Sequence, residues 1–155
     1  MEDLGRIVVQ WAHVLSGVLW IGGGFYTNLV QLPALAAIAP RQVRYIMRVA
    51  EVTIATGILQ IFVNPHNREL LALSSRWAVA IVAGALMALV VYGILRGAAK
   101  PAIERLLAVA PTAAGGDAAA AAEVGRLRER IQRLGYAQLT LGALILVAMV
   151  TARFS

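Results

Sequence analysis

Residues 7–40 read IVVQWAHVLSGVLWIGGGFYTNLVQLPALAAIAP, a run without any charged side chain that lies between Arg6 and Arg41. An α-helix rises 1.5 Å per residue, so about 20 residues cross the hydrocarbon core of a bilayer. The run is too long and too apolar for a core helix of a soluble domain. It therefore predicts a membrane-spanning helix over residues 7–32 that ends at Pro33.

Three further segments meet the same length rule, at residues 45–63, 77–95 and 134–152. The last two are uncharged and are bounded by arginines at both ends. Helices are the open-ended elements that lipid permits, and the alternating pattern of a membrane β-barrel strand is absent. We therefore predict an all-α integral membrane four-helix bundle that forms one domain over residues 1–155.

Composition supports this class: of the 155 residues, 60% are hydrophobic and 14% charged, whereas soluble domains carry about 25% charged residues. The chain has no cysteine, which excludes disulfides, thiolate metal sites, iron–sulfur clusters and c-type haem attachment. The net charge is +6, but the basic residues flank apolar runs and form no patch interleaved with aromatic residues. We expect no nucleic-acid partner. The expected partner is the lipid bilayer, with subunits of a membrane complex or further copies of the chain as additional partners.

The distribution of basic residues predicts the orientation. The first and third connections lie on one side of the membrane and share ten of the 14 lysines and arginines, and the other side has four. Because positive residues mark the cytoplasmic side, both termini are expected to face outward (N-out/C-out). The expected location is the cell inner (plasma) membrane, with several crossings.

The third connection, residues 99–133, is predicted to be a cytoplasmic helical hairpin that extends the third and fourth helices. One arm carries Ile103, Leu106 and Leu107, and the other carries an apolar stripe with helical spacing that consists of Val124, Leu127, Ile131 and Leu134. The segment 110–116 (APTAAGG) predicts the turn between them. Pro101 is expected to kink the first arm.

His13 is the main candidate for chemistry, because an ionisable ring at membrane depth is costly and marks a functional site by default. His13, Gly17, Trp20, Gly24 and Gln31 share one helix face by their spacing. Gly17 removes bulk one turn from the imidazole, which a flat macrocycle such as haem requires and which close helix packing requires equally. Three interpretations stay open: a haem ligand, a copper ligand or proton-handling group, and a buried hydrogen-bonding residue of a structural subunit.

Second ligands can be compared by depth. His13 and Met149 each lie about six residues outward of the middle of their spans, roughly 8–9 Å, so they form the best depth-matched pair for a b-type haem (heme b) or Cu(I). His66 lies in the outer loop on the same side. Methionine on an apolar helix is also an ordinary packing residue.

Two polar groups on the second helix add candidates. Thr53, Thr56, Gly57 and Gln60 share one face and, with Asn28 and Gln31, predict either a polar interior or interhelical hydrogen bonds. Glu51 lies one turn from Arg48, which predicts an interfacial ion pair. Neither a Ser-His-Asp set nor a phosphate-binding loop is evident.

Residues 11–35, WAHVLSGVLWIGGGFYTNLVQLPAL, resemble the opening helix of the copper resistance protein D (CopD)-like and DUF2269-like membrane families. Their pattern is roughly W-x-H-V-x-x-G-x-x-W-x-G-G-x-x-F-x-x-x-V-x-x-P-A-L, with slightly variable spacing, and the matching residues include His13, Trp20, Gly22, Gly23, Pro33 and Ala34. Residues 55–60 (ATGILQ) are similar to the second-helix T-G-x-x motif. Residues 74–106 are similar to the third helix and its charged tail.

A more distant resemblance is to HemJ-type protoporphyrinogen oxidases, which carry a first-helix histidine associated with haem, and to the membrane part of PuuD-type urate oxidases. His13 maps onto that histidine, whereas the third-helix lysine of the HemJ type would fall within residues 78–80, which read AVA here. These resemblances imply a membrane protein of redox or metal handling with haem or copper as cofactor. They fix no reaction, so enzymatic activity stays open.

Overall fold

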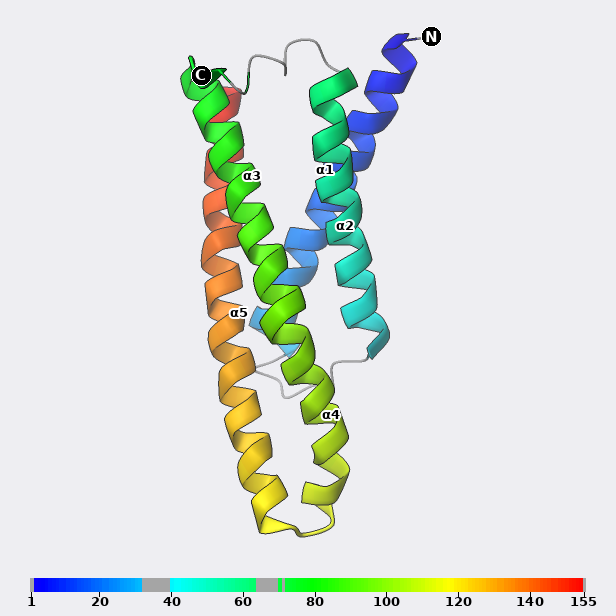
Figure 1. The fold of residues 1–155 in the computed structure, drawn as a ribbon, viewed down its shortest axis with the longest axis vertical. Coiled ribbons are helices and arrows are strands. Elements are labelled where there is room, and N and C mark those ends of the chain that lie inside the picture. Colours follow the sequence, from blue (N-terminus) through cyan, green and yellow to red (C-terminus); the bar gives the residue numbers. More distant parts are fainter. Residues whose placement is uncertain (1, 32–39, 64–69, 71, 155) are drawn as a thin grey trace.

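The computed structural model describes residues 2–31, 40–63, 70 and 72–154, and all regular secondary structure in these ranges is helical (Figure 1). The all-α prediction is therefore confirmed. Pro33 and His66 lie outside the described residues. The elements in chain order are α1 (Glu2–Tyr26), the π-helical turn η1 (Thr27–Gln31), α2 (Pro40–Val63), α3 (Arg76–Ile94), the π-helical turn η3 (Leu95–Ala99), α4 (Lys100–Ala114) and α5 (Ala118–Arg153).

Four helical stretches are long and apolar enough to cross a membrane. Large apolar side chains on them face outward, and Trp11, Phe62 and Val147 each leave more than 60% of their surface exposed. Such faces are consistent with contact to lipid, which supports a protein with several membrane crossings. The four stretches are Leu4–Gln31, Arg41–Val63, Arg76–Ala114 and Ala118–Ala152.

The helices are arranged as two pairs (Figure 1). Helix α1 packs mainly against α2, and α3 packs mainly against α5, whereas contacts between the pairs are fewer. Both chain ends lie at one end of the molecule, here called the terminus end, and the turn between α4 and α5 lies at the opposite, hairpin end (Figure 1).

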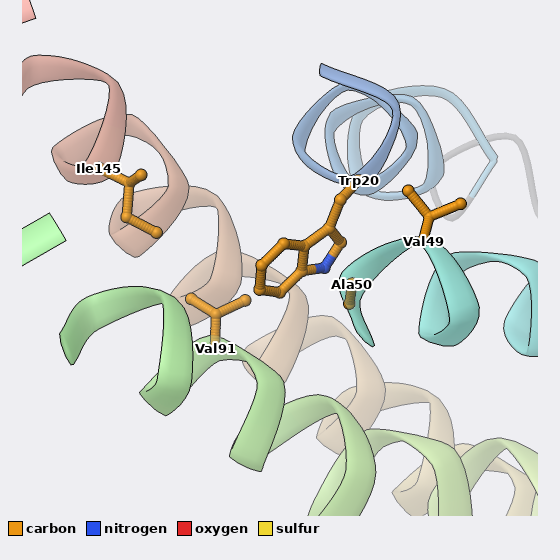
Figure 2. Close-up of a cluster of buried hydrophobic side chains, with 5 residues drawn as sticks. All are labelled: Trp20, Val49, Ala50, Val91 and Ile145. Carbon is orange, nitrogen blue, oxygen red and sulfur yellow. The ribbon is translucent and has the colours of Figure 1, made fainter. Parts of the chain in front are cut away.

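The two pairs meet at a buried cluster around Trp20 (Figure 2). The indole projects from α1 past Ala50 of α2 toward Val91 of α3, and Ile145 of α5 lies on the far side (Figure 2). Trp20 is 6% exposed and Ala50 is fully buried. The small side chain of Ala50 leaves room for the large ring beside α2, so one aromatic residue joins all four spans.

The predicted hairpin is present, with a shorter turn than expected. Helix α4 continues through Pro111 to Ala114, so only residues 115–117 connect the arms, with Gly116 at φ +94°. This backbone conformation favours glycine. Asp117 then caps α5 by accepting a hydrogen bond from the Ala120 amide at 2.9 Å.

Pro101 does not break the helical rod. The chain runs as one helical stretch from residue 76 to residue 114, and the π-helical turn η3 directly precedes the proline. A proline has no N–H to donate to the preceding turn, and a π-helical turn is one way in which a helix absorbs such a defect. The helix is thus continuous through the proline, and the expected kink stays a prediction.

The hairpin arms pack through Ala102, Ile103 and Ile131, with Leu106 and Leu127 at the edge of the cluster. The predicted stripes therefore face each other, except that Leu107 is 38% exposed. Leu106 already fills the facing position, and the next residue is turned about 100° away. Sequence patterns did not indicate that Val43, from the start of α2, completes this cluster.

An ion pair closes the hairpin nearer its turn. Arg105 donates to both carboxylate oxygens of Glu123, at 2.7 and 3.2 Å. These hydrogen bonds lower the pKa of the Glu123 carboxyl below its ordinary value. The two residues belong to opposite arms, so the pair adds a polar contact between α4 and α5 beside the apolar cluster.

Candidate functional site

The imidazole of His13 is held against α2. Its Nδ1 lies 2.9 Å from the Thr53 carbonyl oxygen and 3.3 Å from the Thr56 hydroxyl oxygen. A carbonyl oxygen only accepts hydrogen bonds, so Nδ1 carries the hydrogen and donates it to Thr53. In the neutral ring, this tautomer leaves a lone pair on Nε2.

Gly57 makes room for this ring. A Cβ atom at position 57 would lie 3.0 Å from Cε1 and 3.4 Å from Nδ1 of His13. The first distance is tighter than nine in ten real Cβ contacts, so a larger residue would push the imidazole away by a few tenths of an ångström. Gly57 is thus the residue on α2 that allows the histidine to approach the helix backbone.

Gly17 faces a side chain of α2, whereas a haem site would need open space beside this glycine. It is buried, and a Cβ there would meet Thr53 Cγ2 at 3.7 Å, an ordinary van der Waals distance. Gly17 therefore lies in the α1–α2 interface, as expected from the helix-packing interpretation. The predicted face of α1 does point inward, since Gly17 and Trp20 are buried and His13 is half-buried.

Nε2 of His13 makes no hydrogen bond with the residues that the structure describes. A neutral imidazole with one nitrogen bonded to a backbone carbonyl and the other carrying a lone pair is the usual state of a metal-ligating histidine. The same geometry also serves a histidine whose role is to join two helices. In the described ranges, no three His, Cys, Asp or Glu residues form a group that could hold a metal ion.

The structure describes no hydrogen bond between His13 and Met149, one of the two predicted second ligands. Met149 lies on α5 and is 42% exposed. Helices α1 and α5 approach each other where Ile21 and Phe25 meet Gly142, and toward the terminus end they diverge (Figure 1). The partners that do contact the imidazole are Thr53 and Thr56, both on the predicted polar face of α2. His66 lies outside the described residues.

A small polar pocket lies one helical turn from His13, toward the terminus end. It encloses about 80 Å³ and is lined by Arg6, Val9, Gln10, Gln60 and Val63. Gln10 precedes His13 by three residues and Gln60 follows Gly57 by three, so the pocket continues the same α1–α2 interface. Polar groups therefore extend from the terminus end of this helix pair down to the imidazole.

The remaining polar residues of the first two helices form a separate group. Gln42 of α2 bonds with Gln31 and donates to the Thr27 hydroxyl at 3.0 Å, whereas Asn28 donates to the Gly24 carbonyl of its own helix at 2.8 Å. Asn28 and Gln31 therefore do not line one polar interior with Thr53. Gln42 was missed in the sequence because it lies before the apolar run of its helix.

Glu51 forms the predicted ion pair with Arg48 at 2.9 Å. It also accepts a hydrogen bond from the Tyr92 hydroxyl at 3.1 Å, and Arg96 lies 3.8 Å away. Tyr92 and Arg96 are spaced by four residues on the α3–η3 stretch, which places them on one face. This cluster joins α2 to α3 beside the Trp20 cluster, since Glu51 and Tyr92 directly follow Ala50 and Val91, and it links the two helix pairs by polar contacts.

No match was found among protein-family models, curated proteins or solved structures.

Proposed function

We propose that this is a multi-pass membrane protein of redox or metal handling in which His13 binds a metal centre through Nε2. The observation that carries the proposal is the hydrogen bond from Nδ1 to the Thr53 carbonyl. Such a bond to the distal nitrogen sets the tautomer, orients the ring and raises the basicity of the ligating nitrogen. The resemblance of residues 11–35 to CopD-like and DUF2269-like helices supports the same class.

The iron of a b-type haem is the first candidate. A single neutral histidine suffices as the protein ligand of a haem, and exposed apolar side chains of α1 flank His13, among them Trp11 and Val14. Bound haem would supply a one-electron redox centre. The chain's own contribution is to present Nε2 and to hold the imidazole with Thr53 and Gly57. Met149, the predicted second ligand, lies on α5 in the other helix pair.

A copper ion is the second candidate, because the polar pocket beside His13 provides amide groups from Gln10 and Gln60. Imidazole and thioether groups both suit copper, so His66 and Met149 stay proposed ligands for this case. The third possibility is a structural subunit in which His13 only joins α1 to α2 by its bonds to Thr53 and Thr56.

We place both termini outside the cytoplasm and the α4–α5 hairpin inside it, in a plasma membrane. The excess of lysine and arginine in the first and third connections supports this orientation. The position of both termini at one end of the molecule agrees with an even number of crossings (Figure 1). The exposed apolar faces also leave surface for other subunits or further copies of the chain.

The test is an absorption spectrum of the detergent-purified protein, oxidised and dithionite-reduced, together with elemental analysis. A Soret band that His13→Ala abolishes supports haem ligation, and copper that His13→Ala removes supports the second candidate. The matched control is Ser16→Ala, because the Ser16 hydroxyl bonds only to carbonyls of its own helix. A metal-free and colourless protein from a haem- and copper-replete host would support the third possibility, a structural subunit.

A further inference from the structure

A second cavity lies between the two helix pairs, on the hairpin side of Trp20. It encloses about 80 Å³ and is otherwise open to the surface of the molecule. Trp20, Val91 and Ile145 line it toward the terminus end, and Ile103 and Ile131 line it toward the hairpin end. The stretch of α5 from Ile131 to Ile145 is about 21 Å long at 1.5 Å per residue. The cavity is therefore elongated along the bundle axis.

The described lining carries no charged side chain and few polar ones. Its hydrogen-bonding side chains are those of Thr27, Asn28 and Gln138. The Thr27 hydroxyl accepts a hydrogen bond from Gln42, so its hydrogen can be donated to a ligand. The Asn28 amide nitrogen donates to the Gly24 carbonyl, so its amide oxygen can accept a hydrogen bond from a ligand. The Gln138 amide makes no hydrogen bond with the residues described. An amide within a predicted membrane span ordinarily has a partner, because lipid offers none.

These features restrict the ligand. A phosphate or carboxylate head would lie in an apolar cavity without a cation from the described lining, and burial of an unpaired charge is strongly unfavourable. The ligand is therefore uncharged, elongated and apolar, with a head that accepts hydrogen bonds. Trp20 and Phe25 supply aromatic faces, and Gly24 and Gly142 leave the helix surfaces flat beside them.

We propose that this cavity binds a membrane-dissolved quinone: a planar ring with carbonyl oxygens near Gln138 and Thr27, and an apolar tail along the apolar lining. The ring carbonyls accept hydrogen bonds from the Gln138 amide and the Thr27 hydroxyl, and the ring contacts the aromatic residues in offset geometry. The site is distinct from the metal site proposed above, because His13 is not part of the described lining.

Trp20 provides the signal for a test, because quinones quench indole fluorescence. The protein with Trp11→Phe and Trp77→Phe, in phosphatidylcholine nanodiscs, retains Trp20 as its single tryptophan. We expect decylubiquinone to quench it saturably. Gly24→Leu, which fills the cavity without a clash at Cβ, should weaken binding at least tenfold. Gly22→Leu is the matched control, since its Cβ also meets no atom within 4 Å and it is outside the described lining.

A second pair of variants tests the head group. Gln138→Leu should weaken quenching severalfold, whereas Gln132→Leu, an exposed glutamine on the same helix, should not. If the double tryptophan variant fails to fold, a photoreactive azidoquinone on the native chain should label peptides that contain residues 20–28 and 135–145. His13→Ala should leave quinone binding unchanged, which separates this site from the metal site.

Three results would overturn the proposal. The first is quenching that rises linearly with quinone and is equal in the Gly24→Leu and Gly22→Leu variants, which indicates partition into lipid alone. The second is quenching of Trp20 by brominated phosphatidylcholine that Gly24→Leu relieves, which assigns the cavity to lipid chains. The third is azidoquinone labelling confined to peptides outside the two ranges.

Discussion

Gly57→Ala tests the position of the His13 ring directly. The added methyl group would lie 3.0 Å from Cε1 of His13, so the imidazole must move by a few tenths of an ångström and its bond to the Thr53 carbonyl must lengthen. Overpacking of this kind costs about 1–3 kcal/mol, and an interhelical hydrogen bond in a membrane contributes about 0.6 kcal/mol. We therefore expect a loss of about 1–3 kcal/mol in the free energy of unfolding.

The same substitution should weaken the metal site. Loss of a hydrogen-bonding partner behind a ligating histidine typically lowers metal affinity by about 10–100-fold. We expect the haem or copper content of purified Gly57→Ala protein, measured by absorption or elemental analysis, to fall correspondingly. The unfolding free energy is measured separately, by titration with sodium dodecyl sulfate, and does not depend on the cofactor.

Gly17→Ala is the matched control for this experiment. Its Cβ would meet Thr53 Cγ2 at 3.7 Å, which is ordinary contact, so stability and metal content should change little. Loss of metal in Gly17→Ala with retention in Gly57→Ala would refute the reasoning. That pattern would show that the ligand space lies beside Gly17, as the haem interpretation of the sequence requires, and not against α2.

Three further predictions concern the rest of the molecule. Because the chain has no cysteine, single cysteines at Ser74 and Ala114 should label from opposite sides of intact cells, with Ser74 outside; labelling of both from one side contradicts the topology. Ile131→Ala, at a side chain that is 5% exposed, should lower the free energy of unfolding by about 2–4 kcal/mol, measured by chemical unfolding. Leu107→Ala, at a more exposed side chain, should lower it much less. Equal decreases in the two variants would contradict the packing described for the hairpin. The pKa of Glu123 is lowered in the folded hairpin, so its ion pair stabilises the hairpin at pH values above the ordinary glutamate pKa, and this contribution is lost as the pH falls through the lowered value. The Glu123→Gln variant should therefore lose that part of the acid sensitivity, measured by limited proteolysis at a series of pH values. An unchanged acid profile would show that the pair contributes nothing.

The spans were predictable because each depends on one local property, an uncharged run long enough to cross a bilayer. The partners of His13 were partly predictable for a similar reason. The spacing of Thr53, Thr56 and Gly57 places them on one face of α2, and that face meets the imidazole. A polar side chain within a membrane span needs a partner, so two polar faces on neighbouring helices tend to meet.

The lateral arrangement of the helices within the membrane was not predictable from the sequence. His13 and Met149 match in depth, but depth gives no information on which helices are neighbours or at what angle they cross. The crossing of α1 with α2 decides which glycine faces the ring, and it places Gly57 there in preference to Gly17. In the hairpin, helical periodicity alone does not separate Leu106 from Leu107, which are adjacent in sequence. The contribution of Val43 comes from a helix distant in sequence.

The Trp20 cluster divides the bundle into two parts with different construction. On its terminus side, His13 is positioned by α1 and α2 alone, through Thr53, Thr56 and Gly57. On its hairpin side, the cavity is lined by both helix pairs. Those pairs are joined at the Trp20 cluster and by the contacts of Glu51 with the α3–η3 stretch. Met47 of α2 also packs against Leu95 and Ala99, and Val43 packs into the hairpin cluster. A movement of one pair against the other would therefore reshape the cavity and leave the imidazole in place, because no contact described for His13 crosses between the pairs.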